Sequence, residues 1–396
     1  MVVNGAFALE RRSCYLPFVE DDMTLSRRRF LARSAAAAAA APLVHHLRGS
    51  TCDANETAID FGMGFPHDAI RLNRNENPLG PSEQAIAAAL EGVPKSHRYA
   101  DSILLRSMLA EHHGIDEDWI LVGTGSGELL KLAPLVFARN GGNVVSPLET
   151  FRTTPSFAEK IGADIRWRKL GPDARYDLDG LMGAVDGDTK IFYLVQPNNP
   201  TGTSVTGEEL RRIADGLPQG VLFLIDEAYI HFMEQGASGL DLLKEGRKNV
   251  LVTRTFSKAY ALAGLRIGYG LGHPDIMREI ARFGCGPTST NMAGFGAAVA
   301  SLADEGHVEK SRTYIQKTRA FYEEAFRRMG LSTIAGAPPF MLIEIGERAG
   351  PIRDELAKQK IFVRYGDEWD LPRHIRVSYG LEEENQAFVE ALEKII

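Results

Sequence analysis

The sequence has little of what several common classes of protein require. It contains three cysteines in 396 residues, Cys14, Cys52 and Cys285, which are too few and too scattered for a disulfide framework or a metal cluster, so no metal site is expected. The net charge of −7 is spread along the chain. No basic stretch with interleaved aromatic residues occurs outside the N-terminus, and nucleic acid is therefore not an expected partner.

Two phosphate-binding motifs are also missing. The chain has neither the Gly-Lys-Ser/Thr of a P-loop nor the G-x-G-x-x-G fingerprint of a dinucleotide fold, and no internal repeat or low-complexity linker occurs after the N-terminal segment. What is present is a hydrophobic content of 44% and a charged content of 24%, typical of a globular protein that buries a full core. The length predicts one large domain with a smaller one.

Residues 1–55 differ in composition from the rest and are set aside as a leader. Ser26-Arg27-Arg28-Arg29-Phe30-Leu31 precedes an alanine tract that runs from Ala35 to Ala41. This resembles a twin-arginine export signal, with an apolar region too short to serve as a permanent membrane anchor. The alternative is an alanine-rich helix or a cloning remnant without a targeting role.

The leader predicts a periplasmic location, and without export the protein would be cytoplasmic. Met23 competes with Met1 as the true start, because the residues before Met23 do not belong to such a signal. Whether the leader is cleaved stays open. Twin-arginine export carries folded proteins, so a protein exported this way would take up any cofactor before it leaves the cytoplasm.

From about residue 60, short apolar runs alternate with amphipathic stretches, which predicts an α/β fold with a mostly parallel sheet flanked by helices. Apolar runs without alternation indicate strands that are buried on both faces. The expected strands are Trp119–Gly123, Asn143–Ser146, Lys190–Val195, Val221–Asp226, Val250–Thr255 and Arg266–Leu271. The expected helices are Ser82–Glu91, Ser102–His113, Gly127–Ala138, Thr154–Ile161 and Gly207–Asp215.

After about residue 285 the pattern changes to a long helix and shorter strands, which predicts a smaller α+β domain. The expected elements are a helix over Val308–Met329, strands at Phe340–Ile345, Ile361–Val363 and Ile375–Ser378, and a helix from Glu382 to the end. The predicted domains are the leader at 1–55, a segment at 56–95 that contributes to the small domain and to dimer contacts, a large domain at 96–285, and a small domain at 286–396.

Five short motifs fall where strands end, and open α/β sheets bind ligands at such places. A glycine-rich turn at 123–128 opens a helix and can cradle a phosphate. The strand that ends in Asp226 carries a carboxylate after an apolar run, and a buried acid needs a partner. The motifs are Gly123-Thr124-Gly125-Ser126-Gly127-Glu128, Gln196-Pro197-Asn198-Asn199-Pro200-Thr201-Gly202, Asp226-Glu227-Ala228-Tyr229, Thr255-Phe256-Ser257-Lys258 and Gly264-Leu265-Arg266-Ile267-Gly268.

In this order and spacing the motifs resemble the class I/II aminotransferases that use pyridoxal 5'-phosphate (PLP, fold type I), and more narrowly their histidinol-phosphate aminotransferase branch. The resemblance covers residues 60–396 and includes the segment Arg71–Gly80 and Arg376-Val377-Ser378. It implies the aspartate-aminotransferase-like fold, a homodimer, and small-molecule substrates, namely an amino donor and a 2-oxo acid acceptor.

The resemblance also implies roles for single residues. Lys258 would hold the cofactor as a Schiff base and move a proton, Asp226 would pair with the ring nitrogen, and Phe151 would stack on the ring. The ring oxygen would be held by Asn199 and Tyr229, and the phosphate by Gly125, Ser126, Gly127, Thr255, Ser257 and Arg266, with Tyr99 reaching the partner subunit's phosphate.

Substrate binding is assigned to Arg376, Arg364 and Asn77, the two arginines gripping an acidic group; the alternative for these arginines is a surface ion pair. Phe151 stands where this branch most often has tyrosine. Ala100 replaces the proline that usually follows the tyrosine. Neither departure harms cofactor binding in principle. The phosphate turn also resembles that of broader class I members, so the motifs specify the cofactor more closely than the substrate.

Two other activities on the same scaffold stay open. One is a PLP decarboxylase similar to threonine-phosphate decarboxylase, which would release carbon dioxide. The other is an aromatic amino acid aminotransferase. A non-enzymatic PLP-binding regulator is disfavoured, because Lys258, Asp226 and Arg266 are all present and no DNA-binding segment is attached.

Overall fold

The structure is a computed structural model that describes residues 64–66 and 68–396. Every helix and strand of the described residues lies in the unit Pro66–Ile396. The predicted leader and its export motif are outside the described residues. Among the residues that are described, no helix has the length and apolarity required to cross a bilayer.

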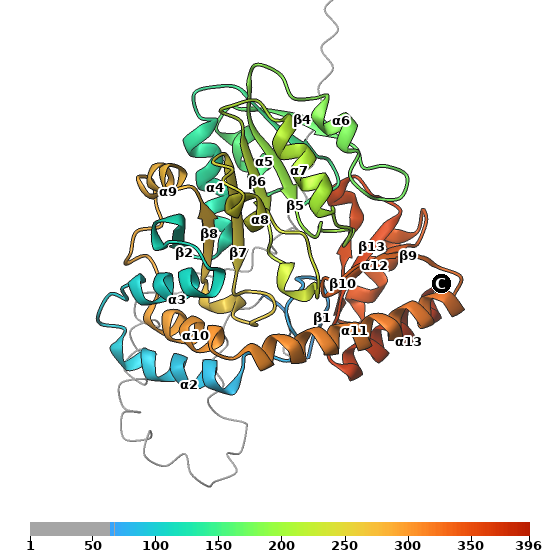
Figure 1. Cartoon of the computed structure of the whole chain (residues 1–396). Helices are drawn as coiled ribbons and strands as arrows, with labels where there is room; N and C mark the ends of the chain where they lie inside the picture. The colour runs from blue at the N-terminus through green and yellow to red at the C-terminus, as the bar shows by residue number, and fades with distance from the viewer. Residues whose placement is uncertain (1–63, 67) are drawn as a thin grey trace, which may run out of the picture. The chain divides into compact units, whose positions relative to one another are not determined.

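The large domain is built on a seven-stranded sheet with the order β2-β8-β7-β6-β5-β3-β4 (Figure 1). The strands from β4 to β7 along this order are mutually parallel, and β8 is antiparallel to both of its neighbours. The predicted mostly parallel sheet is therefore confirmed. The strands are β2 (Ile120–Gly123), β3 (Asn143–Pro147), β4 (Asp164–Arg168), β5 (Thr189–Val195), β6 (Leu222–Asp226), β7 (Val250–Thr255) and β8 (Gly268–Gly272).

The central strands have no polar face because helices cover both sides of the sheet. Alternate residues of a strand point to opposite faces: Phe192 and Leu194 of β5 lie in one hydrophobic core, and Tyr193 and Val195 lie in another. The first core is closed by α3 (Ile103–His113), α6 (Leu178–Met182), α7 (Gly207–Gly216), α8 (Gly239–Lys244) and α10 (Met292–Leu302). The second is closed by α4 (Ser126–Phe137), α5 (Thr153–Lys160) and α9 (Pro274–Ala281).

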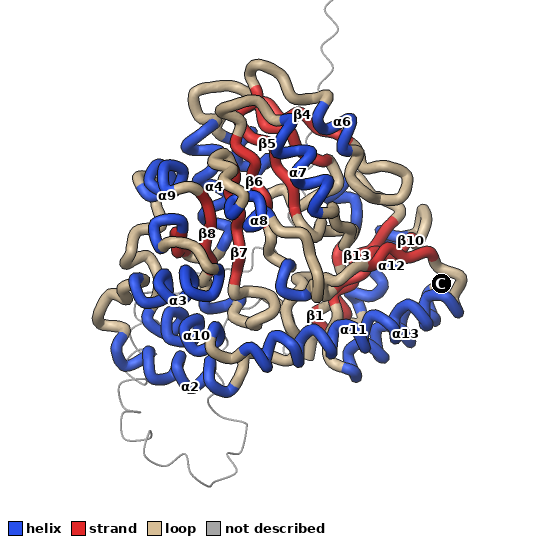
Figure 2. Tube along the Cα trace, in the orientation of Figure 1, coloured by secondary structure: helices blue, strands red, loops and turns tan. Residues whose placement is uncertain are grey.

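The small domain has a four-stranded antiparallel sheet with the order β12-β13-β10-β9. Figure 2 shows its strands apart from those of the large sheet. Near the N-terminus, β1 (Ile70–Arg71) pairs in parallel with β11 (Ile361–Phe362), so the segment before the large domain is tied to the small one. The other elements are β9 (Ser332–Ala335), β10 (Phe340–Glu344), β12 (Arg364–Tyr365), β13 (His374–Ser378), α11 (Glu305–Arg328), α12 (Ala349–Lys358) and α13 (Glu382–Ile395).

Two of the elements that the sequence did not predict are informative. Strand β4, Asp-Ile-Arg-Trp-Arg, was not predicted; it is an edge strand with alternating exposure, and its charged residues hide the strand pattern. Helix α10, which follows residue 285, packs on α2 (Glu83–Gly92), and its Ala297 and Leu302 lie in a core of the large sheet. The predicted domain boundaries stay a prediction.

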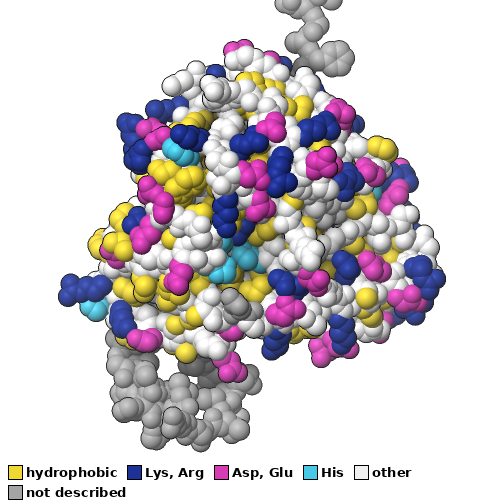
Figure 3. All heavy atoms as spheres, viewed as in Figure 1, with side chains coloured by type: hydrophobic (Ala, Val, Ile, Leu, Met, Phe, Trp, Pro, Cys, Tyr) yellow, Lys and Arg dark blue, Asp and Glu magenta, His cyan; other side chains and the backbone are white. Residues whose placement is uncertain are grey.

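On the face seen in Figure 3, side chains of both charges are interspersed.

Candidate active site

Three polar motifs meet where neighbouring parallel strands end. Val195 of β5 is in register with Asp226 of β6, which is in register with Thr253 of β7. The Gln196–Gly202 loop follows β5 and Lys258 follows β7. The carboxyl ends of parallel strands share one edge of a sheet, so these motifs form a single site there.

Lys258 has its amino group held by the backbone of a segment far away in sequence. Its Nζ donates to the carbonyl oxygens of Arg74 at 2.9 Å and Asn75 at 3.1 Å, and it lies 5.8 Å from the centre of the Tyr229 ring. Burial, followed by the positive charge of Arg376, lowers the pKa of Lys258 to about 8. An amine with this pKa is partly unprotonated near neutral pH and can act as a base.

Asp226 is a buried carboxylate, 1% exposed. Its Oδ1 accepts hydrogen bonds from the Ala228 backbone N–H at 3.2 Å and the Thr253 hydroxyl at 3.3 Å. Burial is the largest cause that raises the pKa of Asp226 to about 7. Both donors are neutral and both hydrogen bonds are long, so the carboxylate can still accept a hydrogen bond from a positively charged group.

The next carboxylate is compensated differently. Glu227 is completely buried and forms an ion pair with Arg254, with Nη2 2.8 Å from Oε2. It also accepts hydrogen bonds from the Ser238 hydroxyl and the Gly239 backbone N–H. Its charge is therefore neutralised within the large domain, which leaves Asp226 as the acid available at the edge of the sheet.

Asn75 joins the two domains at the site and was not predicted as a functional residue. It has a positive φ of 53°, which asparagine tolerates better than most residues. Its Nδ2 donates to the Tyr229 hydroxyl at 2.9 Å, and its Oδ1 accepts from the Ser378 hydroxyl at 2.8 Å. The motif Asn73-Arg74-Asn75 was a usable signal, because asparagine is the residue that supplies both a left-handed turn and an amide.

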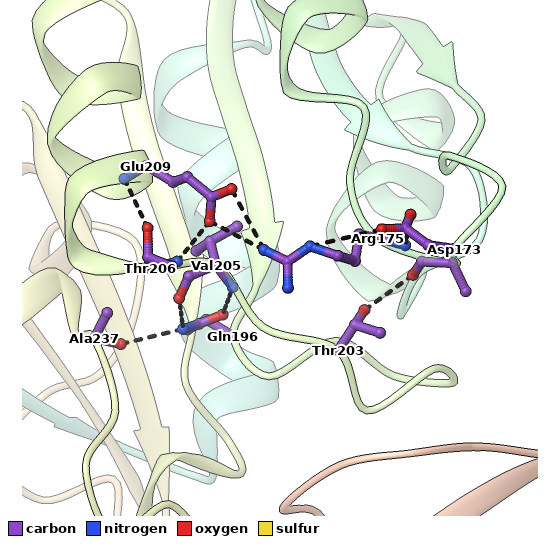
Figure 4. A network of polar contacts seen from close by, with 9 residues as sticks. Asp173, Arg175, Gln196, Thr203, Val205, Thr206, Glu209 and Ala237 are labelled. Carbon is purple, nitrogen blue, oxygen red and sulfur yellow. Dashed lines mark hydrogen bonds and ion pairs between the residues drawn. The ribbon is translucent and has the colours of Figure 1, made fainter.

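The loop that carries Asn199 is held by its own polar contacts, which Figure 4 shows. The Gln196 side chain donates to the carbonyl oxygens of Val205 at 2.9 Å and Ala237 at 3.2 Å, and it accepts from the Val205 N–H at 3.0 Å. Nearby, the Thr203 hydroxyl donates to Ala174 O at 3.0 Å. Because both ends of the loop are anchored, the buried Asn199 side chain has a defined position.

The glycine-rich turn leads into α4 and faces an arginine. No side chain caps this helix at Gly125, so its first N–H groups are available to an anion. A Cβ on Gly125 would lie 2.5 Å from Arg266 Nη2, and a Cβ on Gly268 would lie 2.3 Å from the Ser126 backbone N. Only glycine at both positions lets Arg266 and β8 approach the start of the helix.

Three hydroxyl groups and one carboxylate complete this corner of the site. The Thr255 hydroxyl donates to Ser257 Oγ at 2.9 Å. Glu128 Oε2 accepts from both the N–H and the hydroxyl of Thr124, at 2.7 and 2.8 Å. Glu128 was not singled out from the sequence; it fixes the shape of the turn from within the helix.

Two arginines of the small domain approach the same site. Arg364 of β12 and Arg376 of β13 are directly opposite each other across the two strands. Arg376, 4% exposed, donates to Asn199 Oδ1 at 2.6 Å and to Asn73 O at 2.8 Å. Burial lowers the pKa of Arg376 to about 10. Arg364 is more exposed and pairs with Glu368.

Asn77, Phe151 and Tyr99 complete the set of residues that the sequence assigns to the site. The Asn77 Nδ2 donates to Ala259 O at 3.0 Å and to Ser311 Oγ at 2.8 Å, so this amide holds the chain after Lys258, and its role toward a substrate stays a prediction. Phe151 is 36% exposed and Tyr99 is 84% exposed. Their roles toward the cofactor stay predictions.

The comparisons with known proteins agree with this geometry. The family model described as "Aminotransferase class I and II" matches residues 67–392. Histidinol-phosphate aminotransferase from Symbiobacterium thermophilum is 36% identical over 330 residues, which cover 82% of this chain and 90% of that protein. Histidinol-phosphate aminotransferase 2 from Pseudomonas fluorescens is 35% identical over 340 residues, 84% and 90% of the two chains.

Among solved structures, histidinol-phosphate aminotransferase from Sinorhizobium meliloti in complex with pyridoxal-5'-phosphate has a TM-score of 0.78 and 28% identity, and the match covers 83% of this chain and 92% of that one.

A buried aspartate ends one strand and a lysine follows the adjacent parallel strand, beside a helix N-terminus that no side chain caps. With the family match, this arrangement identifies a PLP-dependent enzyme of the aspartate-aminotransferase fold. The chain belongs to the class I and II aminotransferase family and is an aminotransferase similar to histidinol-phosphate aminotransferases.

The raised pKa of Asp226 predicts how the stability of the cofactor-free protein depends on pH. The folded-state pKa of about 7 lies above the ordinary value of 3.8, so the stabilisation by the protonated acid is complete below about pH 4 and is lost as the pH rises through about 7. The free energy of unfolding of Asp226→Asn minus that of the wild type should therefore be larger at pH 8 than at pH 5, by more than about 1 kcal/mol. Urea unfolding at the two pH values measures this, with the exposed Asp241→Asn as the control. An equal difference at both pH values would contradict the prediction.

Proposed function

We propose that this aminotransferase binds PLP at the carboxyl edge of its large sheet and transfers an amino group from an amino acid or amino phosphate to a 2-oxo acid. The observation that carries the proposal is the meeting of Asp226 and Lys258 at this edge, beside the α4 turn. When bound, PLP withdraws electrons from the substrate Cα into its ring.

The residues at the α4 turn suit the phosphate of this cofactor. Gly125, Ser126 and Gly127 would offer backbone N–H groups at an uncapped helix N-terminus, where an anion is favoured by the helix dipole. Arg266 would add a charge-assisted fork from the facing side, where the absence of a Cβ on Gly125 leaves room for it. The Thr255 and Ser257 hydroxyls would complete the cradle.

Asp226 suits a ring nitrogen that carries a proton. Its carboxylate has only two long, neutral donors, and a buried acid in this position is stabilised most by a charged hydrogen-bond donor. Tyr229 and Asn199 would hold the ring oxygen. The Asn199 carbonyl oxygen already accepts from Arg376, so its amide N–H₂ is the group that would face the cofactor.

Lys258 and Arg376 would act on the substrate. The Lys258 amine, whose pKa burial lowers to about 8, would attach the cofactor and would then carry the proton of the substrate Cα once the substrate amine has displaced it. Arg376 donates to two neutral oxygens, those of Asn199 and Asn73, and its Nε has no hydrogen-bond partner. It would bind the acidic group of the amino donor.

Replacing Lys258 tests this function. In Lys258→Ala no amine remains to attach the cofactor or to carry the proton, so amino transfer should fall by several orders of magnitude. Borohydride reduction of the wild type should fix PLP to the peptide that contains Lys258, and the reaction should release no carbon dioxide. Lys244→Ala, an exposed lysine of α8, is the matched control. Cofactor fixed to another lysine, with Lys258→Ala still active, would refute the proposal.

We infer that the working form is a homodimer, formed through the α2–α3 patch. This patch comprises exposed hydrophobic side chains of α2, α3 and the turn between them, including Leu90 at 65% exposure and Tyr99 at 84%. Exposed large apolar side chains on two helices that both pack on α10 favour a protein interface, and Tyr99 would reach the partner subunit's cofactor phosphate from it. The members are Ile86, Leu90, Val93, Tyr99, Ile103 and Leu104.

Leu90→Glu tests the dimer. Burying a leucine side chain is worth about 1.5–3 kcal/mol, so the charged variant should dimerise at least about tenfold more weakly, as sedimentation equilibrium can measure. Leu381→Glu, an exposed leucine outside the patch, should leave the dimer unchanged. A monomeric wild type, or equal weakening by both variants, would rule the interface out.

We also propose that the leader directs the protein to the periplasm by twin-arginine export. The support is the sequence Ser26–Leu31 ahead of the alanine tract. Replacing Arg27 and Arg28 by lysine should leave the protein in the cytoplasm when fractions of the native host are compared. The same replacement at Arg11 and Arg12, which lie before Met23, is the control and should have no effect. A wild type found only in the cytoplasm would end this proposal.

A further inference from the structure

The loop between β12 and β13 contributes side chains that contact both arginines assigned to the substrate, Arg364 and Arg376. It contains the 3-10 helix Gly366–Trp369 and Asp370. The Trp369 ring centre lies 4.9 Å from the Arg376 guanidinium and 5.7 Å from that of Arg364. Asp370 Oδ2 accepts from Arg152 Nη2 of the large domain at 2.5 Å. The loop therefore contacts both arginines and is tied to the large domain.

Glu368 of this loop occupies the binding edge of Arg364. The Arg364 Nε donates to Glu368 Oε1 at 2.5 Å, and its Nη2 donates to Oε2. This two-point pairing uses the same fork of donors that a substrate carboxylate or phosphate would use. Arg364 consequently has its charge compensated and its preferred anion-binding edge filled.

Arg376 is in the opposite condition. Its two terminal nitrogens contact neutral oxygens, those of Asn199 and Asn73, and its Nε has no partner. Of the two opposed arginines, Arg376 is thus the one whose charge is left for a ligand. With Glu368 in place, the pair presents a net charge equal to one uncompensated guanidinium.

We propose that Glu368 is a specificity residue that closes Arg364 to a second anionic charge, so that the site prefers amino donors with one carboxylate and an uncharged side chain over phosphorylated or dicarboxylic donors. The proposal rests on the proposed function, because it concerns the donor bound by the same arginines.

The physical reason is the balance of charge. A phosphate monoester carries roughly −1.5 to −2 at neutral pH, and beside Arg376 it would either lie against the Glu368 carboxylate or break that carboxylate's pairing with Arg364. Like charges in contact disfavour the wrong ligand. A single carboxylate needs only Arg376 and leaves the Arg364–Glu368 pair intact.

The test follows the first half-reaction of the holoenzyme through the cofactor absorbance, which removes the charges of the acceptor from the comparison. The donors are L-phenylalanine, L-histidinol phosphate and L-aspartate. The wild type should give its highest kcat/KM with L-phenylalanine. Glu368→Gln should raise kcat/KM for the two doubly charged donors by about tenfold or more and leave that for L-phenylalanine within about twofold.

Two further variants separate charge from structure. Glu368→Asp keeps the charge and should retain the preference of the wild type. Glu347→Gln, which removes a surface carboxylate paired with Arg373 on the same domain, should leave kcat/KM unchanged for all three donors. Binding gives an independent readout: calorimetric titration should show phenyl phosphate binding more tightly to the Glu368→Gln holoenzyme than to the wild type, and 3-phenylpropionate binding equally to both.

The outcomes decide between the two proposals. If the wild type prefers L-histidinol phosphate or L-aspartate, or if Glu368→Gln leaves the donor preference unchanged, the role of Glu368 is refuted while the aminotransferase function stands. If none of the three donors changes the cofactor absorbance of the wild type, the proposed function fails together with the inference, and Lys258→Ala then behaves like the wild type.

Discussion

The burial of a carboxylate at the end of β6 is the constraint on which the site depends. Asp226 forms no ion pair within the described residues and has two neutral donors, so its ionised form is costly in the protein alone. Burial raises its pKa and lowers that of Lys258. Burial therefore favours the neutral forms of both Asp226 and Lys258. Their pKa values lie closer to neutral pH as a result, so each group can exchange a proton there.

The small domain is attached to this edge by hydrogen bonds between distant parts of the chain. Arg376 of β13 donates to Asn199, which follows β5, and Ser378 of the same strand donates to Asn75, whose amide donates to Tyr229. The groups that would face the substrate and those that would face the cofactor thus belong to one network. A displacement of β13 would change the position of Asn199 as well as that of Arg376. The residues that would bind the substrate and those that would bind the cofactor are therefore coupled in position.

The parts of the fold that follow from burial were predictable from the sequence. Strands β5, β6 and β7 are apolar runs because both faces are covered, and their polar ends mark the site. Strand β4 was missed because an edge strand carries charges. The hydrogen bond from the Asn77 amide to Ser311, more than 200 residues away, could not be predicted from the motif that contains Asn77. Contacts of this range leave no local pattern.

The two arginines illustrate why a motif is insufficient for a substrate. Arg364 and Arg376 are equally recognisable in the sequence, and they are opposed in the small sheet. Their environments differ in charge. Arg364 is half-exposed and compensated by Glu368, whereas Arg376 is buried among neutral acceptors, which lowers its pKa to about 10. A buried cation without a counter-ion is costly to keep, and an anionic ligand removes that cost. Arg376 is therefore the arginine whose environment favours a substrate anion, and the residues between the two arginines decide whether a second anionic group is admitted.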